Sequence, residues 1–197
     1  MVIGILAVLS ASAAAGMRVA VPLLIIGLLQ AENFWSDVPL LSHIHPQIVI
    51  AVLTSWSLFE LFGSKKLLGQ RVLQLIQLIF SPLVGGILAV TAAKLTQAEL
   101  APLWLVDLVG GLFALVLKLV VVGWFFRLRG VPMWVVFIED CLCILLVLFA
   151  LNAPQEGGLI AMLLFWLAIR SSKDWYLWYQ GQKTDRLEYQ DHPRQAY

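Results

Sequence analysis

The sequence predicts an all-α membrane protein, a polytopic bundle of about six transmembrane helices. Of its 197 residues, 61% are hydrophobic and only 13% are charged, and the mean hydropathy is +0.90. A typical soluble domain is about 25% charged and about 45–50% apolar, so this composition excludes an ordinary soluble enzyme and a disordered chain. The apolar residues form continuous runs rather than alternating with polar ones, which favours helices over strands.

Each membrane span needs about 20 apolar residues to cross the hydrocarbon core. Six stretches of the chain approach or exceed this length, and we expect each to be one span: 2–30, 47–63, 72–95, 103–126, 134–152 and 158–179. Together they form a single transmembrane domain, residues 1–179, followed by a flexible polar cytoplasmic tail, residues 180–197. Residues 2–15 also resemble a short signal peptide, but no basic residue precedes them, so we expect an intact first helix.

Lysine and arginine residues predict the orientation of these spans. Alternate connections and the C-terminal end carry ten of them: Lys65, Lys66, Arg71, Arg127, Arg129, Arg170, Lys173, Lys183, Arg186 and Arg194. The other connections carry acidic residues instead, and Lys94 is the only base near them. Basic loops stay in the cytoplasm. With an even number of spans, both termini are therefore expected to be cytoplasmic.

The first span contains a predicted break. Arg18 lies in the middle of this apolar run, directly after several small residues, and Pro22 follows four positions later. Proline has no backbone N–H, so the carbonyl oxygen of Arg18 loses its partner within a helix. We expect the helix to be kinked or locally broken here, with backbone carbonyl groups free to bind something else.

Ionisable side chains inside the predicted spans are the candidate functional residues, because a charge at the centre of a bilayer is costly. We expect Lys118 to pair with Glu139 or Asp140, since their helices form an antiparallel hairpin, and Arg18 to pair with another acid such as Glu60. The same network has a purely structural interpretation, in which it fixes the register of the helices. The candidates for binding or conduction are Arg18, Glu60, Lys118, Glu139 and Asp140.

Two further patterns concern helix packing. The segment Leu83-Val-Gly-Gly-Ile-Leu-Ala89 recurs as Leu108-Val-Gly-Gly-Leu-Phe-Ala114. The six spans also divide into two sets of three with opposite orientation, as in a 3+3 inverted-topology repeat. A simpler interpretation is a chance similarity between two faces that pack helices closely through small residues.

Three glutamines, including Gln77, share one face of the stretch 67–80, which we expect to enter along the membrane interface.

No pattern of catalytic or metal-binding residues is present. The sequence lacks the motifs of serine hydrolases, zinc proteases and nucleotide-binding proteins. His43 and His45 have no third ligand nearby, and Cys141 and Cys143 are expected to be two separate thiols on a helix. The net charge of +1 does not indicate a surface that binds nucleic acid. We expect no enzyme activity, no metal, no cofactor and no nucleic-acid partner.

Several short motifs resemble a family of bacterial membrane proteins known as domain of unknown function 4126. They are Ala14-Ala-Gly-Met-Arg18, Pro22-Leu-Leu24, Leu58-Phe-Glu60, Pro82-Leu-Val-Gly-Gly86 and Glu139-Asp140. The family usually carries an Asp-Lys pair soon after the glutamate, where this chain has Gly63-Ser-Lys65. The resemblance implies a compact multi-span protein of a bacterial cytoplasmic or internal membrane, with no established activity.

Two function classes remain. The first is a small transporter or channel-like protein that uses Arg18, Lys118, Glu139 and Asp140, as the buried charges and the broken first helix suggest. The second is a non-catalytic assembly or accessory factor for a larger membrane complex, as the aromatic cluster at residues 175–179 suggests. The expected partners are membrane lipids, together with either another protein or further copies of this chain.

Overall fold

The computed structural model describes residues 1–29, 46–63, 67–98, 102–127 and 133–191. These residues form helices and connecting turns, with no strand among them. The described helices are α1 (Val2–Met17), α2 (Ala20–Leu29), α4 (Pro46–Gly63), α5 (Leu67–Leu95), α6 (Leu103–Arg127), α7 (Met133–Asn152) and α8 (Pro154–Asp191). The predicted all-α fold class is confirmed.

Three of the described helices are long and apolar enough to cross a membrane. The segments are Val72–Leu95 in α5, Leu103–Phe125 in α6 and Trp134–Asn152 in α7. They coincide with the third, fourth and fifth predicted spans. Two shorter apolar helical segments, Val2–Met17 and Gln47–Glu60, lie where the first and second were expected. The chain is therefore built as a membrane protein, but the six-span arrangement is not confirmed.

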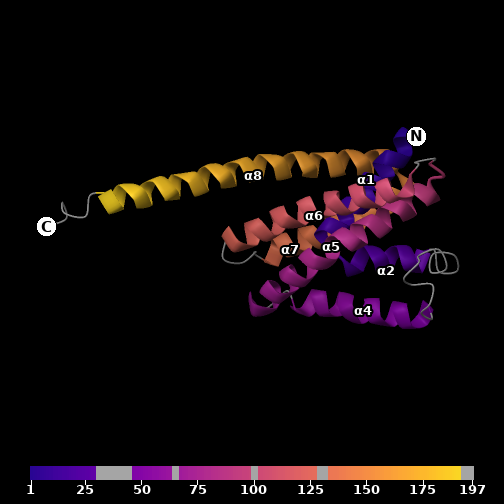
Figure 1. The fold of residues 1–197 in the computed structure, drawn as a ribbon. Helices are drawn as coiled ribbons and strands as arrows, with labels where there is room; N and C mark the ends of the chain where they lie inside the picture. Colours follow the sequence, from indigo (N-terminus) through magenta and orange to yellow (C-terminus); the bar gives the residue numbers. More distant parts are fainter. Residues whose placement is uncertain (30–45, 64–66, 99–101, 128–132, 192–197) are drawn as a thin grey trace.

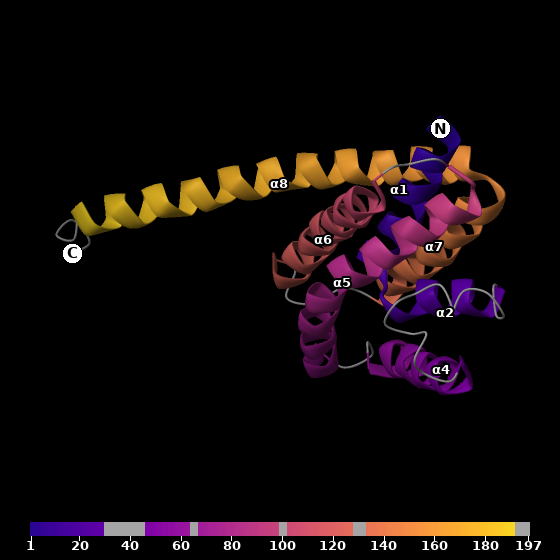
Figure 2. The same ribbon diagram turned by 45° about the vertical axis from the view of Figure 1, so that its right-hand side comes forward.

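The predicted break in the first span is present, and it is sharper than a kink. Helix α1 ends at Met17, and the backbone of Arg18 is extended, with φ −129° and ψ 143°. Helix α2 begins at Ala20, which places Pro22 in its first turn, where a missing N–H costs nothing. From Arg18 the chain turns back, and α2 runs toward the end of the bundle at which α1 starts (Figures 1 and 2). Residues 2–29 therefore form a broken helix rather than one span.

This turn separates the two ends of the chain. Gly4 lies against Ala98, and Leu6 lies against Gly158, so α1 starts at the end of the bundle where α5 joins α6 and α7 joins α8. Helix α8 then runs about 57 Å toward the opposite end (Figure 1). The expectation that both termini are cytoplasmic stays a prediction. Helix α8 continues to Asp191, so residues 180–191 of the expected tail are helical, and their flexibility stays a prediction.

Helix α1 is the centre of the bundle and packs against α5, α6, α7 and α8. Its buried residues are mostly alanine, glycine and serine. A Cβ atom on Gly16 would lie 2.8 Å from the carbonyl oxygen of Ala114, which shows how closely α1 approaches α6. In a membrane, small residues of this kind allow helix backbones to come into contact. The alanine-rich sequence of α1 therefore suits a helix that is surrounded by others.

The two Leu-Val-Gly-Gly segments pack against each other. A Cβ atom on Gly85 of α5 would lie 2.4 Å from the Cβ atom of Ala114, and one on Gly110 of α6 would lie 2.3 Å from that of Ala89. In each segment the first glycine thus receives the alanine that ends the other segment. This reciprocal contact supports the packing interpretation of the repeated sequence. A 3+3 inverted repeat would instead relate α6 to the first helix of the chain, and it is not confirmed.

Candidate functional site: a buried charge cluster at the break between α1 and α2

The five candidate residues come together around the junction of α1 and α2. Arg18 lies at the junction itself, Glu60 near the end of α4, Lys118 in α6, and Glu139 and Asp140 in α7. The exposed fractions are 5% for Arg18, 1% for Glu60 and 0% for Lys118. We call these five residues the charge cluster. Glu139 and Asp140 are half-buried, whereas the other three members lie inside the protein, where their charges must be compensated by one another and by nearby polar groups.

Arg18 forms an ion pair with Asp140, and the two atoms, Nε and Oδ1, are 2.6 Å apart. The sequence predicts that Arg18 pairs with an acid such as Glu60, and it does pair with an acid, but the partner is Asp140, because the register of α1 against α7 decides it. The hydroxyl of Ser10 donates to the carbonyl oxygen of Leu146, and the thiol of Cys143 donates to that of Ala14. One more step along this antiparallel pair brings Arg18 to the level of Asp140.

Lys118 is bonded to the end of α1. Its Nζ atom donates to the carbonyl oxygen of Met17 at 3.0 Å and to the Oε1 atom of Gln77. Within the described residues, no salt bridge joins Lys118 to Glu139 or Asp140, so this predicted pairing is wrong. Although the connection between them is short, α6 and α7 hardly touch, because α1 packs between them. The end of α1 is therefore the first acceptor that Lys118 meets.

The last turn of α1 is held by side chains from three other helices. The carbonyl oxygens of Ala14 and Met17 accept hydrogen bonds from Cys143 and Lys118, and that of Ala15 accepts one from Ser81 at 3.4 Å. The final carbonyl groups of a helix have no partner inside it and carry the negative end of its dipole. A lysine ammonium group is well suited to this position. The break therefore creates acceptors that the rest of the bundle must satisfy.

Gln77 of α5 links Glu60 to Lys118. Its Nε2 atom donates to the Oε1 atom of Glu60 at 2.8 Å, and its Oε1 atom accepts from Lys118. Trp56 also donates to the Oε1 atom of Glu60, at 3.1 Å. Gln77 is only 2% exposed, so its side chain is enclosed by other helices, and the entry of residues 67–80 along the membrane interface stays a prediction. The sequence alone does not show whether a glutamine on a helix faces water or the interior of the bundle. The link that Gln77 forms between Glu60 and Lys118 could therefore not be predicted.

Two carboxylate oxygens in the cluster are buried without a hydrogen-bond partner. They are the Oε2 atom of Glu60 and the Oε1 atom of Glu139. Glu139 interacts electrostatically with both Arg18 and Lys118. Glu60 also interacts electrostatically with both, although it has no hydrogen bond to either. The cluster is thus one electrostatic unit, although Arg18–Asp140 is the only salt bridge among its five members.

Other candidate features contribute less. Within the described part of the chain, no group of three metal-ligating side chains is found, and His43 and His45 lie outside it. Cys141 is an exposed free thiol, and Cys143 is a buried one. Asp107 lies against Gly86 of α5, where a Cβ atom would meet its carboxylate.

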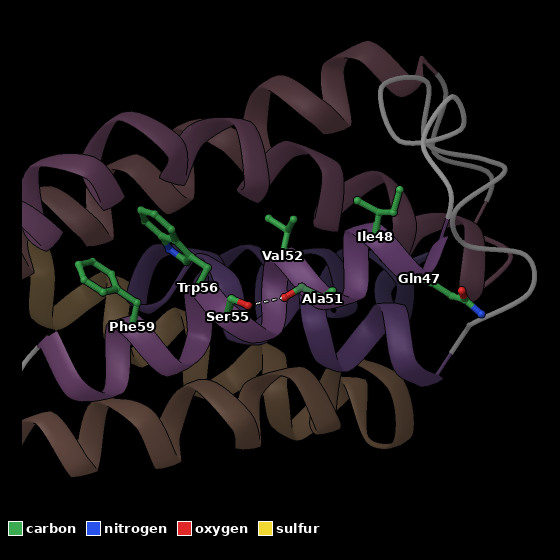
Figure 3. Close-up of a pocket in the computed structure, with 7 residues that line it drawn as sticks. All are labelled: Gln47, Ile48, Ala51, Val52, Ser55, Trp56 and Phe59. Atoms are coloured by element: carbon green, nitrogen blue, oxygen red, sulfur yellow. Dashed lines mark hydrogen bonds between the residues drawn. The ribbon is translucent and has the colours of Figure 1, made fainter.

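Two grooves on the outside of the bundle are lined entirely by residues that the structure describes. The larger, about 550 Å³, runs along α4 and is almost entirely apolar (Figure 3). Its lining residues are Gln47, Ile48, Ala51, Val52, Ser55, Trp56 and Phe59. The second, about 490 Å³, lies between α6 and α8 and is lined by Val116, Ile169, Ser172, Lys173 and Tyr176. Neither contains a member of the charge cluster, so the cluster is closed to both.

Comparison with known families gives one match. The family model described as Domain of unknown function (DUF4126) matches residues 5–174, which include all five members of the charge cluster. No curated protein and no solved structure matches the chain. Because the match covers most of the sequence, this chain belongs to the family described as Domain of unknown function (DUF4126).

Proposed function

We propose that this protein is a small membrane transporter in an occluded state, with the charge cluster as its binding site. The observation that carries the proposal is the broken helix α1–α2, whose carbonyl end lies among buried charges from α4, α6 and α7. Many secondary transporters bind their substrates and ions where a discontinuous helix ends inside the membrane. This protein likewise has a helix that ends inside the bundle and charged side chains around that end.

The unsatisfied oxygens favour a function over a purely structural role. A network that only fixes helix register gains most when every polar atom has a partner, because each buried orphan costs about 1–3 kcal/mol. Here the carboxylates of Glu60 and Glu139 each leave one buried oxygen unpaired. Such incompletely satisfied carboxylates are suited to bind a species that comes and goes.

Burial of the cluster favours an occluded transporter over an open channel. Lys118 and Glu60 are 0% and 1% exposed, whereas a conducting pore would place its charges in water. Access therefore requires a movement. We propose that α2 and α4 move as a pair, because α4 packs mainly against α2 and has little contact with α5.

The proposed orientation follows the basic residues. The ends of the bundle that join α4 to α5 and α6 to α7 carry lysines and arginines, and these ends would face the cytoplasm of a bacterial cell. Helix α1 then starts on the other side of the membrane, and α8 ends in the cytoplasm.

Reconstitution into liposomes tests the proposal. Purified protein should cause a flux of protons or small ions, followed with a potential-sensitive dye and a pH dye, that empty liposomes lack. Lys118→Met should abolish this flux, because it removes the ammonium group at the end of α1. Lys173→Met, an exposed position outside the cluster, should leave it unchanged. Folded wild-type protein that supports no flux of any ion would contradict the proposal.

A second candidate is an accessory factor for a larger membrane complex. Two observations favour it: α8 extends far past the other helices (Figures 1 and 2), and α4 presents an apolar groove that includes Trp56 and Phe59 (Figure 3). Purification in mild detergent distinguishes the two candidates. A protein partner that co-purifies in stoichiometric amount, together with an absence of flux, would replace the transport proposal with this one.

A further inference from the structure

The charges of the cluster do not balance. Arg18 and Lys118 supply two positive charges, whereas Glu60, Glu139 and Asp140 supply three negative ones when all are ionised. The carbonyl end of α1 adds further negative potential at the same place. An uncompensated charge buried in an apolar surrounding is very costly, and the usual remedy is for a group to become neutral. One positive charge is therefore missing from the cluster.

Glu60 is the carboxylate whose charge is least compensated. Asp140 has a direct ion pair with Arg18, and Glu139 is half-buried beside both cations. Glu60 is 1% exposed, and its Oε1 atom accepts from two neutral donors, Gln77 and Trp56. Its Oε2 atom is buried and has no partner.

Among the side chains that the structure describes, none that is cationic lies within salt-bridge distance of Glu60. Trp56 faces it from its own helix, Gln77 from α5, and Arg18 and Lys118 act on it only at a distance. Helix α2, which packs against α4, carries no ionisable residue. The amide of Gln77 lies between Glu60 and Lys118, so the two charges are held apart rather than paired.

We infer that the missing charge is a single exchangeable proton on Glu60. In the occluded state the carboxylate has taken up one proton from water and is a neutral carboxylic acid; when the cluster opens, it returns that proton to water and becomes a carboxylate again. This inference names the proton as the ion that the protein carries or couples to, and in that respect it rests on the proposed transport function. The protonation of Glu60 itself does not depend on transport.

The pH dependence of unfolding tests the inference. Above about pH 5 a glutamate in an unfolded chain is ionised, so a folded protein that keeps its proton loses stability as the pH rises. The unfolding constant of the wild type in detergent should increase by up to about tenfold per pH unit. Glu60→Gln, which resembles the protonated acid, should remove this slope and melt no lower than the wild type at neutral pH. The control Glu156→Gln, at an exposed position outside the cluster, should retain the slope.

Infrared spectroscopy provides a direct second readout. The carbonyl stretch of a protonated carboxyl group should be present in the wild type and in Glu156→Gln, and absent in Glu60→Gln. A band that remains in Glu60→Gln would overturn the assignment to Glu60. So would a Glu60→Gln variant that melts as early as Lys118→Met, because it would show that the native side chain is ionised.

The cation can also be identified. Adding Na⁺ or K⁺ at constant ionic strength should not change the melting temperature, and a rise in the wild type that Glu60→Gln lacks would show a metal ion in place of the proton. Failure of the transport proposal is distinguishable from failure of this inference. In the first case liposomes show no flux while the Glu60 band remains; in the second the band is absent whatever the flux.

Discussion

The bundle has two regions that are built differently. Helices α1, α5, α6, α7 and α8 form a body in which glycine and alanine bring backbones into contact, as at Gly85 and Ala114. Helices α2 and α4 form a pair beside this body (Figures 1 and 2), and their apolar side chains are larger. Ile48 and Val52 of α4 are more than half exposed. The body is held by close packing of small residues, whereas α4 contacts the rest of the protein mainly through α2.

The charge cluster lies at the boundary between these two regions. Arg18, at the start of the pair, is bound to Asp140 of the body, and Glu60 of α4 is bound to Gln77 of α5. Polar contacts thus connect the α2–α4 pair, which we expect to move, with the body, which we expect to remain fixed. The comparison teaches that stability and function can be altered separately, and the following substitutions test this separation.

Removal of the ammonium group at the boundary should have the largest effect. Lys118→Met leaves the carbonyl oxygen of Met17 and the amide oxygen of Gln77 unsatisfied and makes the cluster more negative. Loss of one partner from a buried charge network typically costs about 3–5 kcal/mol. We expect a large decrease in melting temperature in detergent, whereas the exposed control Lys173→Met should change stability by no more than about 0.5 kcal/mol. Equal effects of the two variants would show that the charge of Lys118 is not needed.

The ion pair should show an intermediate effect with a measurable coupling. We expect Arg18→Met and Asp140→Asn to destabilise the protein individually, and the double variant to lose less than the sum, with a coupling of about 1–3 kcal/mol. The same cycle with Lys118→Met and Asp140→Asn should be closer to additive, because no salt bridge joins these two residues. Strictly additive losses for Arg18→Met and Asp140→Asn would show that the two side chains do not interact, which would contradict this contact between the two regions.

Within the body, a single methyl group should be sufficient to disturb the packing. Gly85→Ala would place a Cβ atom 2.4 Å from that of Ala114 and 2.9 Å from the carbonyl oxygen of Gly110, so we expect a loss of about 1–3 kcal/mol. Gly123→Ala on the same pair of helices has no atom within 4 Å of the new Cβ, and alanine is the better helix former. It should be neutral or slightly stabilising. Similar melting temperatures for both variants would contradict the close approach of α5 and α6.

The sequence predicted the composition of the cluster but not its pairing. The cost of intramembrane charge singled out Arg18 and Lys118, and the proline at position 22 predicted the break, because both signals depend on local chemistry. The partners depend on which helices touch. A short connection between α6 and α7 suggested that they are neighbours, yet α1 lies between them. Hydropathy also could not show that the chain turns back at Arg18, since a broken helix and a single span have the same apolar composition.

Accessibility of three positions from outside the cell tests the central claim, that residues 2–29 enter the bundle and turn back. In a background without Cys141 and Cys143, cysteines would replace Val2, Glu156 and Lys173, which are exposed in the structure. Val2 and Glu156 lie at the same end of the bundle, whereas Lys173 is about 26 Å further along α8. An impermeant thiol reagent should label the first two in intact cells and the third only after permeabilisation. Protection of Val2 together with Lys173, with Glu156 labelled, would show that residues 2–29 cross the membrane as one span and would contradict the account.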